Sequence, residues 1–456
     1  MSLAKKLYDI GSLVTDDEFI ELLKVDFNPA DYATLFIDFT IKDGKAEAKL
    51  QKSSLDNTKT LFTKAIGGRG LGYYYLYPNF KYDSESDLYK KFKNSFHTFE
   101  KSVLVFGGER NHDLIKPVVE YIKNYNQDEL GLKSFDKGNY LLVFGVNGKT
   151  IRELMPEISS NFASNAAFLH SDLEEKEAID YISGKKELCG YNPDVKFFTY
   201  DNYHKGFKPQ ILDKLPLSKQ SATCIKKGWI YTINNLRFYH KGLEYIIIPS
   251  LLKFDEVAYK KILNGLKRIQ QSTKNLEEKS IKEDSFIRRL EAQSEGLVGN
   301  AYLDIYFTEL NLTNLSVRIF GSMEDLLPSK IREVGSKMMK QKVCDYYLAE
   351  RKKEGYLCLG DYFSKIELFT SFTKSSLPNK VLQEKIYLAK LFLGYEKIEH
   401  KELLDKFEHY REYDFENKKK LTDEGVKNWI EYSDSFVENE DRTLEFLGSI
   451  NAIKRS

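Results

Sequence analysis

Two dipeptides that end in glycine constrain the fold more than any other feature of this chain. Asp43-Gly44 lies inside the run TLFIDFTIKDGKAEAKL, and Asn147-Gly148 lies inside NYLLVFGVNGKTIREL. Such pairs, flanked by alternating apolar residues, favour the two-residue turn of a β-hairpin. The sequence therefore predicts a hairpin at each dipeptide. The helical spacing of apolar residues over 3–23 predicts an opening helix before the first hairpin, broken at Gly11.

The rest of the chain changes between helical and strand patterns. Residues 254–296 are charged and predict helix, whereas YLDIYFTELNL and LSVRIFG return to strand character. After Pro328 almost every segment has helical spacing, and TLEFLGSINAIKRS predicts a helix that still continues at the last residue. The chain is therefore predicted to end in a mainly helical region.

These patterns predict an α+β protein with several domains, because 456 residues exceed what one hydrophobic core usually serves. We expect an N-terminal α+β domain over residues 1–180 and a small, basic, zinc-finger-like module inserted over 181–253. A helix and strands over 254–335 complete the N-terminal region. A mainly helical C-terminal region over 336–456 follows.

The composition excludes several classes of protein. The longest apolar runs, such as YIIIPSLL at 245–252, fall well short of the roughly 20 residues that a membrane-spanning helix needs. The N-terminus has no sustained apolar stretch typical of a secretory signal. Four scattered cysteines cannot form a disulfide framework. They are Cys189, Cys224, Cys344 and Cys358. We expect a cytoplasmic protein without a membrane partner.

The charged residues are nearly balanced overall but unevenly distributed. The chain has 69 Lys and Arg against 68 Asp and Glu. Residues 204–241 nevertheless hold eight basic residues and one acid, and 330–353 hold eight and three, whereas 423–445 are acidic. Such segregation can place a positive stripe on one face, which suits contact with phosphates. The alternative is a set of solvated faces.

No motif in the sequence carries a recognisable enzymatic chemistry. Gly148-Lys149-Thr150 matches the end of a phosphate-binding loop, but Val143 stands where the motif needs its first glycine. The glycines of IGGRGLG at 66–72 do not fit the dinucleotide-binding spacing. The seven histidines form no metal-binding pair on a helix, and no nucleophile elbow is present. We expect no catalytic site.

The glycine-dense loop offers a candidate contact to nucleic acid instead. Glycine lets a backbone approach a groove closely, an arginine can donate two parallel hydrogen bonds to guanine, and an aromatic ring can stack on a base. A plain surface turn is the alternative. The candidate residues of this loop are Gly68, Arg69, Gly70 and Tyr73.

The cysteines of the basic module form only half of a zinc site. A four-cysteine site needs a C-x-x-C pair at each end, whereas Cys189 and Cys224 stand singly. His204 and His240 could complete a set of four ligands, but the spacings are long and irregular. We expect no zinc and no other cofactor.

Two segments of this module resemble a known family. KELCGYNPDVKFFTYDNYHKGFKPQI and ATCIKKGWIYTINNLRFYHKGLEYIIIPSLL are similar to the cysteine-containing module of the large subunit of type I-B CRISPR Cascade. That family shows C-x-x-C-G, a second C-x-x-C and an aromatic strand ending in I-P-x-L-L. Lys186 and Lys227 replace two of its four cysteines, so packing of the aromatic strands would have to stand in for the metal.

Other blocks extend the resemblance over roughly the first 335 residues. The opening helix with TLFIDFTI is similar to the family's N-terminus, and LSVRIFGSMEDLLPSKIREV to its strand and following helix. Large subunits of this family usually end in a helical bundle that resembles the small subunit. This chain has only part of such a bundle, so we expect it to be truncated or supplied by a separate polypeptide.

The resemblance implies a non-catalytic subunit of an RNA-guided antiviral complex. It would contact the short motif beside the target in double-stranded DNA (the PAM), help hold the R-loop, and recruit the helicase-nuclease. Its partners would be the other Cascade subunits, the guide RNA and the target DNA. A general RNA-binding scaffold protein and a metal-dependent nuclease are the alternatives.

We predict that basic residues of the module hold phosphates, on the strength of the local charge excess. The family pattern assigns none of them. The candidates are Lys205, Lys208, Lys219, Lys226, Lys227 and Arg237.

Overall fold

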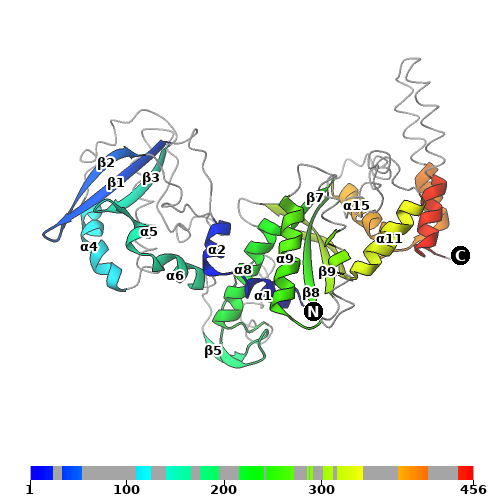
Figure 1. The fold of residues 1–456 in the computed structure, drawn as a ribbon, viewed down its shortest axis with the longest axis horizontal. Coiled ribbons are helices and arrows are strands. Elements are labelled where there is room, and N and C mark those ends of the chain that lie inside the picture. Colours follow the sequence, from blue (N-terminus) through cyan, green and yellow to red (C-terminus); the bar gives the residue numbers. More distant parts are fainter. Residues whose placement is uncertain are drawn as a thin grey trace, which may run out of the picture. The chain divides into compact units, whose positions relative to one another are not determined.

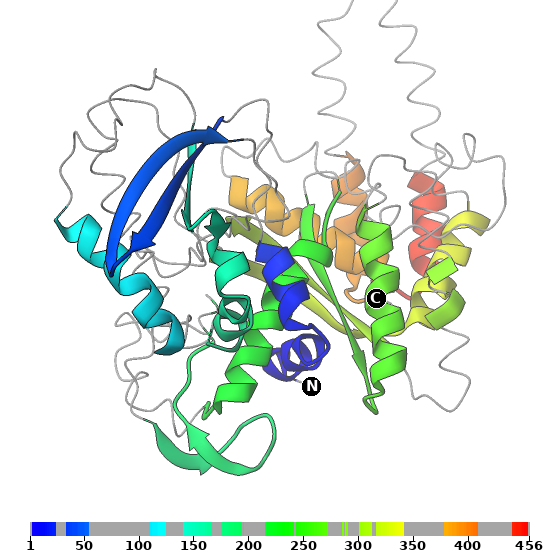
Figure 2. The same ribbon diagram turned by 60° about the vertical axis from the view of Figure 1, so that its left-hand side comes forward.

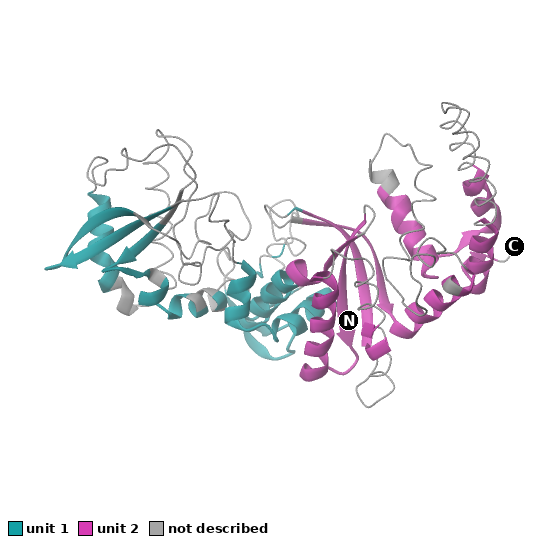
Figure 3. Cartoon of the chain, turned by 45° about the horizontal axis from the view of Figure 1, so that its top comes forward, with its two compact units in different colours: residues 1–231, 311–316 teal, residues 232–310, 317–456 magenta. Residues whose placement is uncertain are grey.

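The computed structural model has two compact units, coloured separately in Figure 3. The first comprises residues 1–231 and 311–316, and the second comprises 232–310 and 317–456. Each unit combines helices with β-sheets, which confirms the predicted α+β class. The structure describes residues 2–23, 33–53, 109–124, 140–165, 175–193, 195, 215–240, 243–271, 285–286, 288–290, 301–311, 316–341, 378–408 and 440–454.

The first unit opens with two short helices, as predicted. Helix α1 spans Leu3–Gly11 and α2 spans Asp16–Leu23. The Ser2 hydroxyl accepts the N–H of Lys5 at 3.3 Å and so caps α1. The Thr15 hydroxyl accepts the N–H of Glu18 at 3.2 Å and caps α2 in the same way. The predicted break at Gly11 is confirmed.

The first predicted hairpin is confirmed. Strand β1, Ala33–Lys42, pairs antiparallel with β2, Lys45–Ser53. Asp43 and Gly44 between them have φ angles of 48° and 75°. Two successive positive φ angles define the turn whose twist matches that of the strands on either side.

The second hairpin is confirmed at its turn but is shorter than the sequence pattern indicates. Strand β3, Tyr140–Val146, runs parallel to β1, and β4 is only Lys149–Thr150. The Glu153 carboxylate accepts both the N–H of Thr150, at 2.9 Å, and its hydroxyl, at 3.0 Å. This capping-box arrangement starts helix α5, Ile151–Leu154, and so ends the strand.

The sheet β2-β1-β3-β4 carries helix α4, Glu109–Lys123, against β1 and β2 (Figure 1). The Phe39 ring of β1 lies 5.8 Å from Tyr121 of α4 and 5.9 Å from Phe144 of β3, measured between centroids. These aromatic contacts form the core between sheet and helix. Helix α6, Glu157–Asn165, lies against α2.

Helix α8, Lys219–Asn235, packs closely against α1. A Cβ built on Gly228 would lie 1.9 Å from the carbonyl oxygen of Leu7, and one built on Gly11 would lie 1.7 Å from that of Cys224. Only glycine at both positions allows the two backbones to approach this closely. The aromatic run WIYTI at 229–233 lies inside α8.

The second unit contains the sheet β10-β9-β8-β7. Its strands are β7, Arg237–His240; β8, Leu243–Leu251; β9, Ala301–Asn311; and β10, Ser316–Leu326. The strand predictions for YIIIPSLL, YLDIYFTELNL and LSVRIFG are thereby confirmed. Helix α9, Glu256–Gln271, lies against β8, as Figure 1 shows.

The sheet of the second unit is buried on both faces along its central strands. Seven successive residues of β8 from Tyr245 to Leu251 are buried, and β9 is buried from Leu303 to Thr308. The Tyr259 hydroxyl of α9 donates to the Pro249 carbonyl of β8 at 2.6 Å. Burial on both faces explains why these strands appear in the sequence as continuous apolar runs.

The C-terminal helices are only partly as predicted. Helix α11, Pro328–Lys340, begins at a proline, whose fixed φ suits a first helical position. Helix α15 spans Pro378–Phe392, and residues 400–408 and 440–449 are also helical.

The expectation that the last residues form a continuing helix is wrong. That helix ends at Ser449, and Asn451 takes a left-handed φ of 59°. The N–H of Ala452 donates to the Leu447 carbonyl at 2.9 Å, which satisfies one of the free carbonyls at the helix end. Strand β12, Ile453–Lys454, then pairs in parallel with β11, Ile398–Glu399.

The two units and the predicted regions divide the chain at different places. The first boundary between units falls after Tyr231, within α8. Strand β8 lies in the predicted module over 181–253, yet it pairs along seven residues with β9 from the next predicted region. In the described residues, the module therefore contributes a central strand to a larger sheet.

The contact between α1 and α8 predicts that Gly228→Ala destabilises the protein. The new methyl group would meet the Leu7 carbonyl, and a backbone atom cannot move without shifting the helix. We expect a loss of about 2 kcal/mol or more in the free energy of unfolding, measured by urea denaturation.

Gly448→Ala is the matched control, because no atom lies within 4 Å of the position that its methyl group would take and the residue is helical. We expect it to be neutral or to stabilise by up to about 1 kcal/mol. Equal effects of the two substitutions would contradict the close helix contact.

Candidate nucleic-acid interface

Part of the predicted site lies outside the residues that the structure describes. These candidates are Gly68, Arg69, Gly70, Tyr73, Lys205 and Lys208. Their role in binding nucleic acid stays a prediction. His204, a possible metal ligand, also lies outside the described ranges.

The three lysines of α8 lie in different surroundings. Lys219, in the first turn of the helix, is exposed. Lys226 is 1% exposed and Lys227 is 9% exposed. The Lys227 ammonium forms an ion pair with the Asp16 carboxylate at the start of α2. Of these three lysines, Lys219 is exposed, whereas Lys226 and Lys227 lie within the packing of the first unit.

Arg237 takes part in a network that joins three strands. Its guanidinium donates to the Glu244 carboxylate of β8 at 2.5 Å. The other oxygen of Glu244 accepts the Thr308 hydroxyl at 3.1 Å and the N–H of Leu310 at 2.9 Å, both from β9. Glu244 thus links β7 to β9 across β8. The guanidinium of Arg237 is therefore part of the hydrogen bonding that stabilises the sheet.

The buried carboxylate of Asp180 joins the β5–β6 hairpin to α8. Strands β5, Lys176–Ile179, and β6, Lys186–Cys189, form this hairpin, which lies near the start of α8 (Figure 2). Asp180 is 0% exposed. One of its oxygens accepts the N–H of Ser183 at 2.6 Å and the Ser221 hydroxyl at 2.9 Å; the other accepts the N–H of Ser218 at 2.6 Å.

These donors determine the charge state of Asp180. Burial by itself raises the pKa of this carboxyl, but the N–H groups of Ser218 and Ser183 and the Ser221 hydroxyl outweigh it. The pKa of Asp180 is therefore lowered below 3.8, and the group is ionised at neutral pH. The Ser218 hydroxyl also accepts the N–H of Ser221 at 3.3 Å and caps α8.

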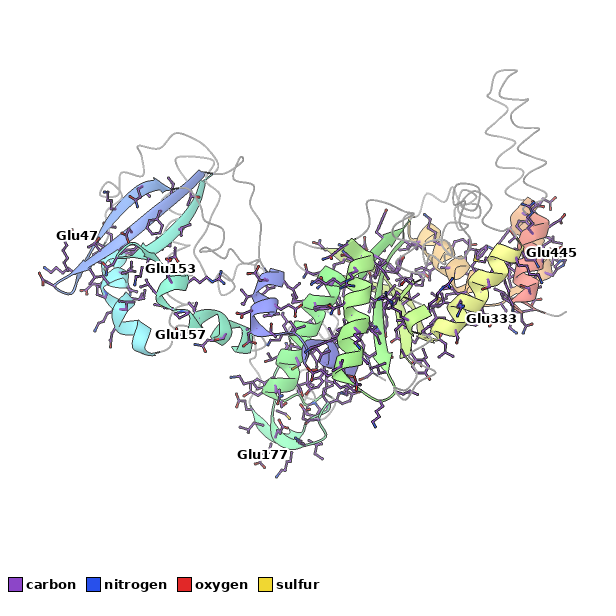
Figure 4. All side chains as sticks on the ribbon, viewed as in Figure 1. Glu47, Glu153, Glu157, Glu177, Glu333 and Glu445 are labelled. Atoms are coloured by element: carbon purple, nitrogen blue, oxygen red, sulfur yellow. The ribbon has the colours of Figure 1, made fainter. Side chains whose placement is uncertain are left out.

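Each lysine that replaces a family cysteine has a carboxylate partner. The Lys186 ammonium lies 2.7 Å from the carboxylate of Glu177 on the neighbouring strand of the β5–β6 hairpin. Figure 4 labels Glu177. The Lys227 ammonium pairs with Asp16. An ammonium group cannot bind a metal ion, so these two positions carry ion pairs where a zinc site would need thiolates.

Among the described residues, the two cysteines of this module have too few ligands around them for a zinc site. Cys189 is buried, and its thiol contacts the Ala178 carbonyl at 3.8 Å. Burial raises the pKa of both thiols, and the neighbouring Lys227 does not reverse this at Cys224. Within the described residues, no three His, Cys, Asp or Glu side chains gather into a metal site. These residues do not fit a zinc ion.

The second basic segment of the sequence begins on α11. The carboxylate of Glu333, a residue labelled in Figure 4, forms ion pairs with the ammonium groups of Lys337 at 2.6 Å and Lys330 at 3.2 Å. These two lysines lower the pKa of Glu333. Residues 342–353 lie outside the described ranges.

A basic surface that the local charge counts missed lies on α9. Its exposed positions include Lys260, Lys261 and Arg268, with Lys267 partly exposed. The signal is present in the sequence as two basic pairs seven residues apart, in KKILNGLKR. A count of charges along the chain includes the acidic residues that follow, so the excess of basic residues is not seen. Projection of the residues onto a helix places the basic residues on one face.

The central part of the chain matches a known protein family. Residues 178–326 match the family model for the central domain of the CRISPR-associated protein TM1802. The matched segment runs from β5 to the end of β10, and includes Asp180, both described cysteines, α8 and α9. This match supports a role for the chain as a CRISPR-associated protein.

Two other findings accompany this match. A search of curated proteins found no match to the chain. Among the described residues, no helix is both long and apolar enough to cross a bilayer.

The Asp180 network predicts that Asp180→Asn destabilises the protein and changes its acid sensitivity. Because the folded-state pKa is below the unfolded value, the carboxylate stabilises the fold above about pH 4, and this contribution is lost as the pH falls through the folded-state pKa. We expect a loss of about 2 kcal/mol or more at neutral pH, measured by urea denaturation.

The loss should shrink as the pH falls from about 4 through the lowered folded-state pKa, because the carboxyl is then protonated first in the unfolded and finally in the folded protein. Asp405→Asn, at an exposed position, is the control and should change little at any pH. A difference between wild type and Asp180→Asn that stays constant down to acid pH would contradict the proposed charge state.

The two ion pairs predict that the fold does not need zinc. We expect chelation of the purified protein by EDTA to leave the thermal midpoint unchanged, measured by differential scanning fluorimetry. A large fall in the midpoint, restored by added zinc, would contradict this prediction.

Proposed function

We propose that this chain is the large, non-catalytic subunit of a type I-B CRISPR Cascade. The match of residues 178–326 to a CRISPR-associated central domain carries this proposal. It covers the module from Lys186 to Leu252 that resembles the type I-B large subunit, and the block LSVRIFG that resembles another part of it. Two lines of evidence thus point to the same part of the chain.

In this proposal the chain helps the complex to find its target. Base pairing with the guide RNA reads the sequence, while protein reads the short motif beside the target and holds the displaced strand by its backbone. The loop over Gly68 to Tyr73 is proposed to approach the groove of the duplex. Lys219 supports a phosphate contact, because it is exposed at the start of α8.

We further propose that the chain cuts nothing and recruits a separate helicase-nuclease in the cytoplasm. The best-buried carboxylate of the matched hairpin, Asp180, accepts hydrogen bonds from protein donors on both of its oxygens. A buried carboxylate with hydrogen bonds on both oxygens stabilises the fold, which supports a structural role for Asp180. The proposed partners are the other Cascade subunits, the guide RNA, the target DNA and the helicase-nuclease.

A target-binding assay tests the proposal. The complex is assembled with guide RNA, with and without this chain, and is titrated with duplexes that carry or lack the permissive motif. We expect motif-dependent binding that disappears when the chain is omitted, measured by electrophoretic mobility shift. Duplexes without complementarity to the guide are the control for non-specific binding.

Other results would favour the two alternatives. Equal binding with and without the chain would contradict the proposal. Binding of many RNAs without dependence on guide or motif would indicate a general RNA-binding scaffold. Cleavage of DNA by the isolated chain with Mg²⁺ or Mn²⁺ would indicate a nuclease.

A further inference from the structure

Helix α9 is amphipathic, and its solvent face is basic. Its buried side consists of apolar residues and the tyrosine that anchors it to β8. The four cations occupy two rows along the exposed side, with Lys260 and Lys267 in one row and Lys261 and Arg268 in the other. Residues seven apart lie about 10 Å apart along a helix. Each row therefore presents positive charge over two turns.

A second helical segment contacts α9. Residues 285–286 and 288–290 are helical, and the Phe286 ring contacts Gly265 of α9. Gly265 lies one turn from both Lys261 and Arg268, at positions i−4 and i+3. The ring of Phe286 fills the space that a side chain at Gly265 would need, because a Cβ built there would lie only 2.5 Å from the ring.

Two arginines follow Phe286 in the same helical segment. Arg288 and Arg289 are both exposed and lie within one helical turn of Phe286. Among the described residues from 256 to 290, six basic residues accompany a single acid. That acid, Glu256, pairs with Lys260 at 2.8 Å.

The charges of α9 are less mixed in sign than those of α11. On α11, Glu333 lies between Lys330 and Lys337 and pairs with both. On α9 the cations stand next to cations along the chain, and the helix itself carries one carboxylate, at its first turn. Such a concentration of exposed positive charge suits an anionic partner.

Exposed apolar side chains adjoin the same face at its N-terminal end. Val257 is 64% exposed and lies one turn before Lys260 and Lys261. Phe254 is 43% exposed, and its ring lies 5.5 Å from that of the buried Tyr259. Leu252, just before them, is 67% exposed.

We propose that the solvent face of α9 binds single-stranded nucleic acid. The lysines and arginines hold the backbone phosphates, and the apolar end with Phe254 receives an unpaired base. A duplex would use only the cations, because its bases are already stacked inside the helix, whereas an unpaired base can leave water by stacking on an exposed ring. The inference rests on the proposed function, in which such a complex holds a displaced strand.

Two variants of the assembled complex test this inference. Lys261→Ala/Arg268→Ala removes two cations from one row, and Phe254→Ala removes the exposed ring. The probes are a labelled oligothymidine strand and a duplex of the same length without guide complementarity. Affinity is measured by fluorescence anisotropy at several salt concentrations.

We expect the double variant to bind the single strand about tenfold more weakly near physiological salt, with a salt slope smaller by about 1.4. We expect Phe254→Ala to weaken binding of the single strand severalfold and to leave the duplex unchanged. The control is Lys397→Ala/Lys401→Ala, which removes two exposed lysines elsewhere in the second unit. It should change neither affinity nor slope.

The different failures are distinguishable. Unchanged single-strand affinity and slope in Lys261→Ala/Arg268→Ala would overturn the inference, as would an equal loss in the control. Loss of duplex binding alone would overturn the assignment to a single strand. If target binding is also indifferent to the whole chain, the proposed function itself has failed. Circular dichroism of each variant verifies that it is folded.

Discussion

The close contact between α1 and α8 at Gly11 and Gly228 is the constraint on which the first unit depends. Because neither residue has a side chain, the carbonyl groups of one helix reach the backbone of the other. This contact fixes Lys227, the neighbour of Gly228, where it can pair with Asp16 at the start of α2. At the other end of α8, Asp180 holds the helix start to the β5–β6 hairpin. Packing and buried hydrogen bonds thus hold these elements together.

The proposed functional surface lies in the second unit, where the charged residues are arranged differently. The central strands of the sheet β10-β9-β8-β7 are buried by apolar packing, and hydrogen bonds of Glu244 link β7, β8 and β9. Because these charges are satisfied inside the fold, they are poor candidates for contact with a ligand. The cations of α9 lie outside the packed layer, on a helix whose buried face is anchored by Tyr259. The fold therefore separates charges that stabilise it from charges on a solvent face that a partner can reach.

The sequence predicted local features well where a local cause determines them. The turns at Asp43-Gly44 and Asn147-Gly148 require positive φ, which the dipeptides indicate directly. Helix α8 was harder, since residues 225–233 are buried throughout and a helix buried on all sides shows no periodicity. The partner of Lys227 could not be predicted, because Asp16 is 211 residues away in the sequence. The basic face of α9 could be predicted in principle, but only after the residues were projected onto a helix.

The most direct test of a guided complex is the RNA that copurifies with the tagged full-length chain. We predict RNAs of one length class that carry CRISPR repeat sequence joined to different spacers, recovered together with the other subunits. A broad mixture of cellular RNAs, with no enrichment of repeat-derived sequence, would contradict a role in such a complex. Such a mixture would instead assign the basic surface of α9 to a general RNA-binding protein.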